Sequence, residues 1–177
     1  MTAITAFKTA LVAELPSLRA FAMSLAGSHD RADDLVQETV VKAWTAQGSF
    51  QEGTSLRAWL FTIMRNTYFS QYRKARREVQ DSDGTAAAGL VSPPAQNGHL
   101  DLADFRTALE ALSPDQREAL ILIGASGFSC EEAAAICGCA VGTIKSRVNR
   151  ARQRLMELLA IDALDDIAPD MLRFGAA

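Results

Sequence analysis

Two stretches of the chain concentrate positive charge with no acidic residue among the cations. Arg65–Arg77 carries five basic residues and Lys145–Arg154 carries another five, which together are ten of the 18 lysines and arginines. The formal net charge of the chain is nevertheless −3. Because salt screens charges beyond about 8–10 Å, the local potential decides what each stretch binds. A solvated helix face usually carries both signs, so the two unbalanced stretches predict a polyanion that is contacted at two places.

The first basic stretch is also rich in aromatic residues. Five of the chain's twelve aromatic residues lie at 55–77, namely Trp59, Phe61, Tyr68, Phe69 and Tyr72. We expect Trp59 and Phe69 to pack inside the fold, and Tyr68 and Tyr72 to lie at a partly exposed end beside the cations. Stacking of a base on an aromatic ring contributes ~1–3 kcal/mol and tolerates any base sequence. The combination indicates binding of single-stranded or opening DNA.

The second basic stretch belongs to a sequence typical of a helix-turn-helix. Residues 129–148 place the small Ala134 where two crossing helices approach closely, and Gly138 where the turn needs backbone freedom. Ile144 and Val148 are predicted to face the first of the two helices. The second helix is predicted to turn these residues outward: Thr143, Lys145, Ser146, Arg147, Arg150 and Arg154. Recognition helices read base edges near their N-terminus and bind phosphates further along, so DNA binding is favoured over a helical hairpin whose basic end is merely solvated.

The spacing of the cysteines and the lack of catalytic motifs in the sequence predict neither metal binding nor enzyme chemistry. Cys130, Cys137 and Cys139 match no common zinc spacing, and the two histidines are far away in sequence. We expect small, buried, reduced thiols, with metal binding or redox sensing as the alternative. The sequence contains no recognisable catalytic triad or phosphate loop. It therefore predicts no metal, no cofactor and no enzymatic activity.

Composition and periodicity predict an all-α chain. Of the 177 residues 49% are apolar and 22% charged, which is typical of a globular protein, and no stretch alternates as a half-buried strand would. The first helix is expected at 5–26 with an interruption near Pro16, because proline cannot donate to the helical ladder. The next two are expected from a cap at Ser28 or Asp30 to about Ala46, and from a cap at Thr54 or Ser55 to Arg77. Further helices are expected at 100–111, 113–125, 129–137 and 141–159, with Ser113 and Ser129 as caps.

A segment rich in glycine, proline and small polar residues divides the chain at 79–100 and has the composition of a flexible linker. The predicted organisation is a helical domain at 1–78, the linker at 79–100, a second helical domain at 101–160 and an acidic tail at 161–177. No run approaches the ~18 apolar residues that span a bilayer, and the N-terminus lacks a secretory signal. We therefore expect a cytoplasmic protein without membrane contact.

In this order, the motifs resemble bacterial sigma factors of the extracytoplasmic-function (ECF, group IV) class, the initiation subunits of RNA polymerase. "ADDLVQETVVKAW" (32–44) resembles region 2.2, the polymerase-binding helix. "SLRAWLFTIMRNTYFSQYRKARR" (55–77) resembles regions 2.3 and 2.4, which melt and read the −10 element, and residues 112–155 resemble region 4, which reads the −35 element. "GTSLRAWLFTIMRN" and "ICGCAVGTIKSRVNRAR" are further similar to the alphaproteobacterial general-stress-response branch, whose members are held inactive by a small anti-sigma factor.

The resemblance implies roles for individual residues. Leu35, Gln37 and Glu38 would bind core RNA polymerase. The loop at 49–55 would help hold a −10 base flipped from the stack, with Trp59 and Asn66 beneath it. The backbone phosphates near the −10 element would be bound by Arg65, Arg73, Lys74, Arg76 and Arg77. In region 4, Lys145, Ser146, Arg147 and Arg150 would face the −35 groove and its flanks, which makes promoter DNA, core polymerase and an anti-sigma factor the implied partners.

Three other interpretations stay open at this point. A sigma-like decoy that only sequesters an anti-sigma factor would have no need of two cationic stretches. A plain helix-turn-helix repressor would leave the first 78 residues unexplained. A metal or redox sensor would rest on the three cysteines alone.

Overall fold

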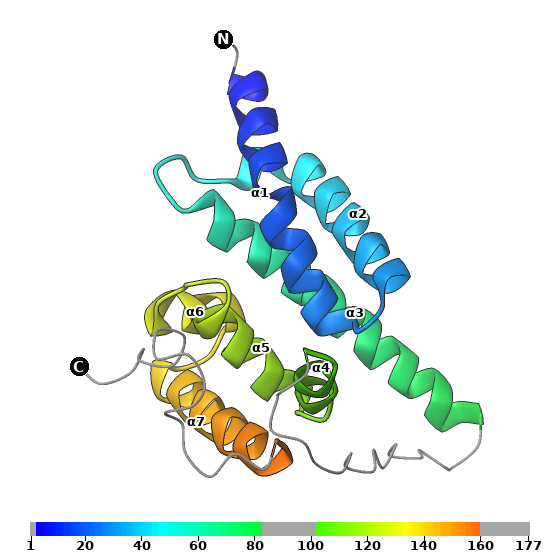
Figure 1. Ribbon diagram of the computed structural model, residues 1–177. Coiled ribbons are helices and arrows are strands. Elements are labelled where there is room, and N and C mark those ends of the chain that lie inside the picture. Colours follow the sequence, from blue (N-terminus) through cyan, green and yellow to red (C-terminus); the bar gives the residue numbers. More distant parts are fainter. Residues whose placement is uncertain (1–2, 83–101, 160–177) are drawn as a thin grey trace. The chain divides into compact units, whose positions relative to one another are not determined.

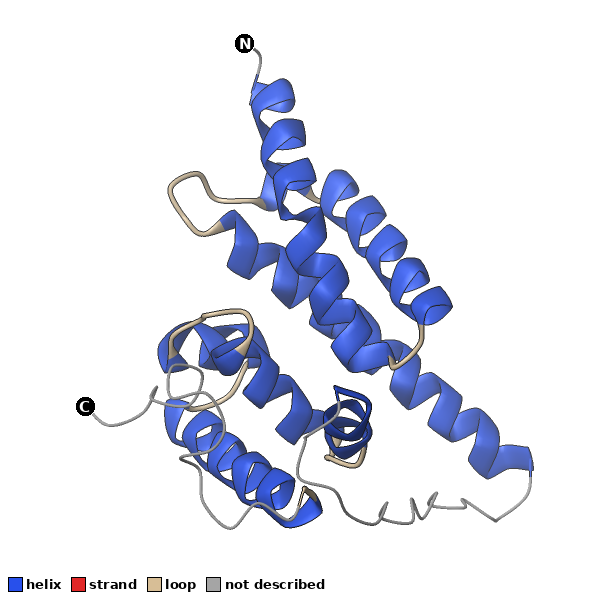
Figure 2. Ribbon diagram, in the orientation of Figure 1, coloured by secondary structure: helices blue, strands red, loops and turns tan. Residues whose placement is uncertain are grey.

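The computed structural model describes residues 3–82 and 102–159. Within these ranges the chain forms seven α-helices, one short 3-10 helix and no strand, which confirms the predicted all-α class (Figures 1 and 2). Contacts between the elements divide the chain into two compact units, residues 1–88 and 89–177. Most of the predicted linker and the whole acidic tail lie outside the described residues.

The first unit is built from three helices that all pack against one another: α1 (Ala3–Ala26), α2 (His29–Thr45) and α3 (Leu56–Ser82). Its core contains Leu18, Phe21, Leu35, Leu60 and Phe61, each at most 1% exposed. The rings of Phe21 and Phe61 stack with centroids 4.8 Å apart. The helices thus bury one apolar side each, as the helical spacing of these residues predicts.

Two loops connect these helices and set where they begin. Gly27, with φ 72°, makes the turn before α2, whose N-cap position is Ser28. The predicted side-chain cap at Ser28 does not form in the structure. The 3-10 helix η1 (Gln47–Ser49) opens the second loop, and the hydroxyl of Ser55 accepts a hydrogen bond from the backbone N–H of Ala58 at 3.1 Å. Ser55 rather than Thr54 is therefore the cap of α3, which continues to Ser82, past the predicted end at Arg77 and the predicted start of the linker.

The predicted interruption near Pro16 is wrong, since α1 runs without a break from Ala3 to Ala26 with Pro16 inside it. Pro16 removes the donor that would serve the carbonyl of Val12, four residues earlier. Both residues are exposed, so water can serve this carbonyl instead. Leu11 and Leu18, on the buried side, keep the helix packed on both sides of the proline.

The second unit contains α4 (Leu102–Glu110), α5 (Pro114–Gly124), α6 (Cys130–Cys137) and α7 (Val141–Leu158). Helices α5, α6 and α7 pack against one another, and α4 packs on α7. Ser113 and Ser129 cap α5 and α6 as predicted, and both caps are capping boxes, with Gln116 as the partner of Ser113 and Glu132 as the partner of Ser129. Gly138 ends α6 with φ 63°, a left-handed conformation that glycine adopts without strain, as the helix-turn-helix prediction requires.

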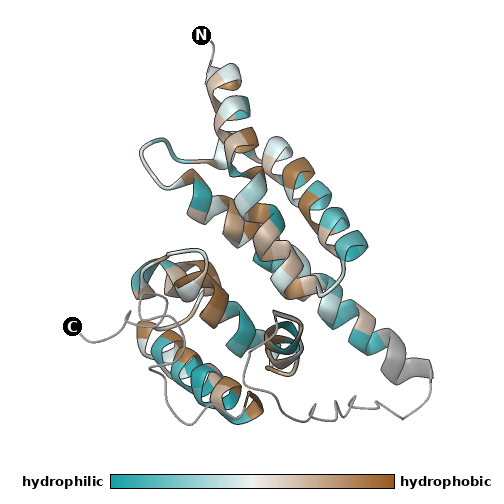
Figure 3. Cartoon of the chain, in the orientation of Figure 1, coloured by the Kyte–Doolittle hydropathy of each residue, from teal (hydrophilic) through white to brown (hydrophobic). Residues whose placement is uncertain are grey.

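The core of the second unit fixes α7 in place. Ala108, Leu112, Ala151 and Leu155 form one buried cluster that joins α4 to α7. Arg117 secures the turn between α4 and α5, because its guanidinium donates hydrogen bonds to the carbonyls of Leu109, Glu110 and Leu112 at 2.9, 2.7 and 3.2 Å. Hydrophilic and hydrophobic residues alternate along the ribbon of α7, because each turn of the helix contributes to a polar face and to an apolar face (Figure 3). The helix therefore presents one polar face to solvent.

Candidate nucleic-acid interface

The exposed face of α7 consists of polar side chains at helical spacing. Ile144, Ala151 and Leu155 are buried on its inner side. Three cations, two amides and a hydroxyl lie on the outer side, and all six are exposed: Lys145, Ser146, Asn149, Arg150, Gln153 and Arg154. An α-helix of this kind fits the major groove of duplex DNA, where arginine and lysine bind guanine and amides bind adenine. The structure thus presents four of the six predicted residues of this helix on one solvent face.

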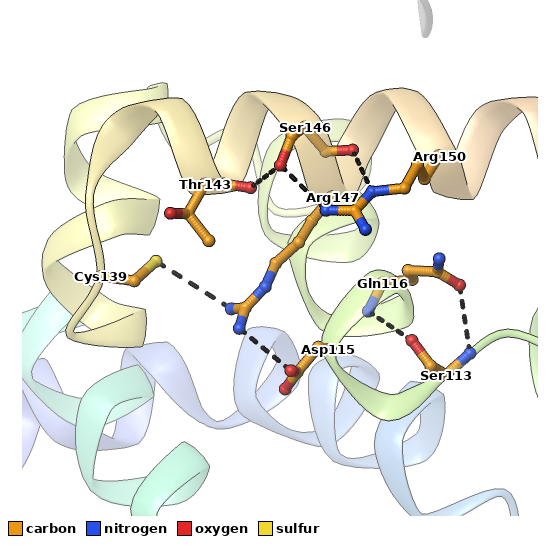
Figure 4. Close-up of polar contacts among 8 residues, drawn as sticks. All are labelled: Ser113, Asp115, Gln116, Cys139, Thr143, Ser146, Arg147 and Arg150. Atoms are coloured by element: carbon orange, nitrogen blue, oxygen red, sulfur yellow. Dashed lines mark hydrogen bonds and ion pairs between the residues drawn. The ribbon is translucent and has the colours of Figure 1, made fainter.

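Hydrogen bonds within α7 hold part of this face in a defined geometry (Figure 4). The hydroxyl of Ser146 donates to the carbonyl of Thr143 at 3.0 Å. The guanidinium of Arg150 donates to the carbonyl and the hydroxyl of Ser146, at 3.3 and 3.2 Å. Arg154 pairs with Glu157 at 2.8 Å. Ser146 and Arg150 therefore act as one arranged pair of polar groups, and Thr143, which is half-buried, supplies a backbone contact to it.

Arg147 does not point outward as predicted. Its side chain is only 20% exposed, and its guanidinium lies 3.0 Å from the carboxylate of Asp115 in the first turn of α5 (Figure 4). A second guanidinium nitrogen lies 4.0 Å from the sulfur of Cys139, in the turn between α6 and α7. The physical reason is the acidic first turn of α5, which lies within reach of Arg147, whereas Arg154, only about 20° away around the helix, pairs with Glu157 of α7 itself. The side chain consequently meets the neighbouring helix.

Sequence reasoning missed Asn149 and Gln153, which lie on the same exposed face. Both are uncharged, so a search for basic residues passes over them. The available signal was spacing, because Asn149 follows Lys145 by four residues and Gln153 follows Asn149 by four. Amide side chains that occupy consecutive turns of a groove-reading helix can read bases that cations cannot distinguish.

The acidic start of α6 adds a negative charge close to this face. The pKa of Glu131 is lowered chiefly by a hydrogen bond from its own backbone N–H, then by the Ser129 hydroxyl and by the positive charge of Lys145. Glu131 is exposed in the first turn of α6, where the partial positive charge of a helix N-terminus favours a carboxylate. The carboxylate thus stays ionised beside the cationic face of α7.

The three cysteines are free thiols, as expected. Only Cys137 is buried, whereas Cys130 and Cys139 are half-buried, so the expectation of three buried thiols is wrong for two of them. Among the described residues no group of three or more histidine, cysteine or acidic side chains could hold a metal ion.

In the first unit, aromatic and basic side chains come together along α3. Tyr68 and Tyr72 stack with their ring centroids 6.2 Å apart and an interplanar angle of 25°. Tyr72 is exposed and Tyr68 half-buried. Phe69 packs edge-on against Tyr68 at 5.3 Å, and Arg65 covers the Phe69 ring at 4.8 Å. The structure therefore brings the two predicted stacking residues together into a small aromatic ladder with one open side.

The basic residues that follow this ladder lie on a part of α3 without a buried side. Every residue from Ser70 to Arg77 is exposed. This set includes the predicted phosphate contacts Arg73, Lys74, Arg76 and Arg77. Asn66 is exposed one turn before Ser70 and accepts a hydrogen bond from Arg65 at 3.4 Å. Cations on such a projecting helix can approach a sugar-phosphate backbone from several sides.

Trp59 is half-buried in an aromatic cluster that includes the loop before α3. Its ring lies 5.5 Å from that of Phe50, a residue of this loop, and 6.3 Å from Phe7 of α1. Phe7 lies equally close to Trp44 of α2, at 6.3 Å. The structure therefore joins the loop at 49–55 to Trp59, whereas Asn66 lies two turns further along α3.

The three residues of α2 that are predicted to contact polymerase differ in exposure. Leu35 is 1% exposed and belongs to the core, so it cannot contact a partner directly. Gln37 is exposed. Glu38 is half-buried, and it binds Lys42 at 2.6 Å and accepts a hydrogen bond from Gln71 of α3. Glu38 thus ties α2 to α3 one turn from the tyrosine ladder.

Two exposed apolar residues of α2 were missed by the sequence reasoning. Val41 is 64% exposed and Trp44 41% exposed. Together with Gln37 they follow one another at spacings of four and three residues, which places all three on one side of the helix. Large apolar side chains grouped on an exposed face are typical of a surface that binds another protein.

Comparisons with known proteins place both units in one family. Residues 11–78 match the model of sigma-70 region 2, and residues 102–155 match that of sigma-70, region 4. The chain is 62% identical over 160 residues to the ECF RNA polymerase sigma factor EcfG of Rhodopseudomonas palustris, which covers 90% of this chain and 88% of that protein. It is 40% identical over 126 residues to the ECF sigma factor SigC of Mycobacterium tuberculosis, which covers 71% and 68%.

Solved structures agree with these relatives. The sigma factor RpoE of Bartonella quintana, determined in complex with the anti-sigma factor NepR, is 64% identical, with a TM-score of 0.77 over 89% of this chain and 98% of that one. CnrH, determined in complex with the cytosolic domain of CnrY, is 30% identical, with a TM-score of 0.65 over 90% of each chain.

Proposed function

Because the chain belongs to the ECF RNA polymerase sigma factors, we propose that it directs core RNA polymerase to stress-response promoters by reading a −35 duplex and capturing −10 bases. The observation that carries this proposal is the exposed face of α7, where cations and amides alternate in a helix-turn-helix. As a transcription initiation factor it would supply recognition, and the polymerase would supply the chemistry. Because it would act together with RNA polymerase, the protein would be located in the cytoplasm.

In this proposal α7 enters the major groove at the −35 element. Lys145, Ser146, Asn149 and Arg150 would meet base edges and adjacent phosphates, and Arg154 would bind phosphate further along. The bonds from Arg150 to Ser146 favour this use, because a fixed guanidinium loses less conformational freedom when it binds. The domain boundaries that accompany the proposal are region 2 at 1–78, the linker at 79–100, region 4 at 101–160 and the tail at 161–177.

The end of α3 would bind the −10 element. The open side of Tyr72 offers a platform for an unpaired base, and the cations of Arg73–Arg77 would follow the strand's phosphates. The loop at 49–55 with Trp59 would hold a base extruded from the stack. The contact between Phe50 and Trp59 supports this role, because it gives the loop a fixed aromatic wall.

The exposed side of α2 would bind core polymerase through Gln37, Val41 and Trp44. Of the three residues that the family resemblance implies, only Gln37 belongs to this set. The exposed apolar residues Val41 and Trp44 take the place of the buried Leu35, and Glu38 holds α3 instead of contacting polymerase.

Control by an anti-sigma factor is the last part of the proposal. RpoE was solved in complex with the anti-sigma factor NepR, and CnrH in complex with the cytosolic domain of CnrY. RpoE matches this chain over 98% of its own length at 64% identity. We therefore propose that a small anti-sigma protein also sequesters this chain and competes with polymerase for it.

Transcription in vitro tests the function. Alphaproteobacterial core polymerase with the purified chain should start transcripts at promoters of the general stress response, and Arg150→Ala should reduce them at least tenfold. The matched control is Arg106→Ala, an exposed arginine of α4 away from the proposed surfaces, which should leave transcription unchanged. If neither the wild-type chain nor Arg150→Ala started transcripts above core polymerase alone, while both bound the anti-sigma factor, the chain would be a decoy rather than an initiation factor. Transcription by Arg150→Ala at the wild-type level would instead contradict the use of this face of α7 in promoter recognition.

A further inference from the structure

The side chain of Arg147 lies between three parts of the second unit. It starts from α7, donates to the Asp115 carboxylate of α5 at 3.0 Å and contacts Cys139 in the turn of the helix-turn-helix at 4.0 Å. With the DNA-binding role of α7 as its premise, we propose that Arg147 is a positioning residue, which fixes the recognition helix on α5 through Asp115 and makes no contact with DNA.

Asp115 is itself held ready for this pairing. It lies in the first turn of α5, where the helix N-terminus favours a carboxylate. The backbone there is fixed by the capping box, in which Ser113 and Gln116 exchange two hydrogen bonds of 3.3 Å. Figure 4 shows the box directly beside the Asp115–Arg147 pair. The backbone that carries the Asp115 carboxylate is thus fixed by the capping box.

The environment of the pair gives it more strength than an ordinary surface ion pair. The side chains of Arg147 and Asp115 are 20% and 49% exposed, whereas those of Arg154 and Glu157, in a pair of similar length, are 53% and 64% exposed. Reduced exposure weakens solvent screening, and a charge-assisted hydrogen bond is stronger than a neutral one. Around the helix, Arg147 lies at the edge of the exposed face of α7, about 60° from Arg150 and about 20° from Arg154, and its guanidinium is bound to Asp115 of α5. A side chain held by α5 at this edge stabilises the orientation of the face.

The two possible roles of Arg147 predict opposite effects for the neutral variant Asp115→Asn. If Arg147 contacted DNA, loss of Asp115 would free the arginine and remove a negative charge near the phosphates, so promoter binding would tighten. If Arg147 positions α7, loss of Asp115 removes the anchor, and binding weakens by about tenfold, the value of one lost charge-assisted hydrogen bond. The direction of the change therefore decides between the roles.

The experiment measures promoter affinity of the full chain bound to core polymerase, between 50 and 200 mM salt. Arg147→Met and Asp115→Asn should each weaken binding by about tenfold, and the double variant by no more than either alone, because the pair acts as a unit. The slope of log K against log [salt] should stay at the wild-type value for all three. Arg150→Met, the matched control, should lower that slope by about 0.9, as expected for one lost phosphate contact. Far-UV circular dichroism at the assay temperature confirms that each variant is folded.

Two results would contradict the inference in different ways. A lower salt slope for Arg147→Met, together with tighter binding by Asp115→Asn, would make Arg147 a DNA contact and leave the proposed function intact. Unchanged affinity and slope for both Arg150→Met and Arg147→Met would instead refute the use of α7 for promoter binding, and the positioning role with it.

Discussion

Leu35→Ala should destabilise the first unit without removing a contact to polymerase. The side chain is 1% exposed on the inner side of α2, in line with the buried residues Ala32, Thr39 and Ala43. Truncating a buried leucine to alanine costs about 3 kcal/mol, from lost transfer free energy and the cavity that remains. A change of that size raises the unfolding equilibrium constant more than a hundredfold.

Tryptophan fluorescence in urea measures this effect in the first unit alone, because both tryptophans, Trp44 and Trp59, belong to it. With a slope of about 1–2 kcal/mol per M, the unfolding midpoint of Leu35→Ala should fall by about 1.5–3 M. Gln37→Ala, on the exposed side of the same helix, is the control and should change stability by less than about 0.5 kcal/mol.

An assay of polymerase binding distinguishes the buried side of α2, which stabilises the first unit, from its exposed side, which is proposed to bind core polymerase. At a temperature where Leu35→Ala is folded, it should bind core polymerase like the wild type. Val41→Ser should bind at least fivefold more weakly and keep the wild-type urea midpoint, because its side chain is 64% exposed. A Leu35→Ala protein with an unchanged midpoint and lost polymerase binding would refute the assignment of Leu35 to the core.

Three further predictions concern the other surfaces. Arg117→Met should lower the free energy of unfolding of the second unit by about 1.5–3 kcal/mol, followed by circular dichroism, because three carbonyls at the end of α4 lose a charged donor. Tyr72→Ala should weaken binding of a −10 non-template strand by the polymerase complex roughly 5- to 150-fold, whereas Tyr72→Phe should bind normally in the same fluorescence assay. Since the pKa of Glu131 is lowered in the folded protein, its stabilising effect should be complete above the pKa of the unfolded chain and be lost as pH falls through the folded value. An NMR titration of the Glu131 carboxyl should accordingly give a midpoint below that of the same residue in an unstructured peptide.

The parts of the fold set by neighbouring residues could be predicted from the sequence. The cap at Ser113 and the capping box at Ser129 depend on residues within the next turn, and both form. Gly138 was identified as the turn of the helix-turn-helix because glycine alone adopts its conformation freely. Of the cations predicted on the outer side of α7, Lys145, Arg150 and Arg154 are exposed and Arg147 is not.

Features set by distant residues could not be predicted in this way. The partner of Arg147 is 32 residues away in sequence, and nothing near Arg147 indicates that Asp115 will lie beside it. Pro16 was expected to interrupt α1, but packing by α2 and α3 on the other side of the helix outweighs the missing hydrogen bond. Leu35 is a different case. Its spacing to Ala32 and Thr39 indicates a buried position, whereas the family resemblance implies a contact with core polymerase.

In the proposed function, the exposed end of α3 would make the affinity for a nucleic-acid strand depend on the folding of that helix. Without a buried side, residues 70–77 rely on intrinsic propensity, and Arg73, Arg76 and Arg77 repel one another at spacings of three and four residues. A row of phosphates would cancel this repulsion, so the ligand would reinforce the helix that presents the cations. The binding free energy would then depend in part on helix formation in residues 70–77. The backbone amides of this segment should exchange their hydrogens more slowly once DNA is bound.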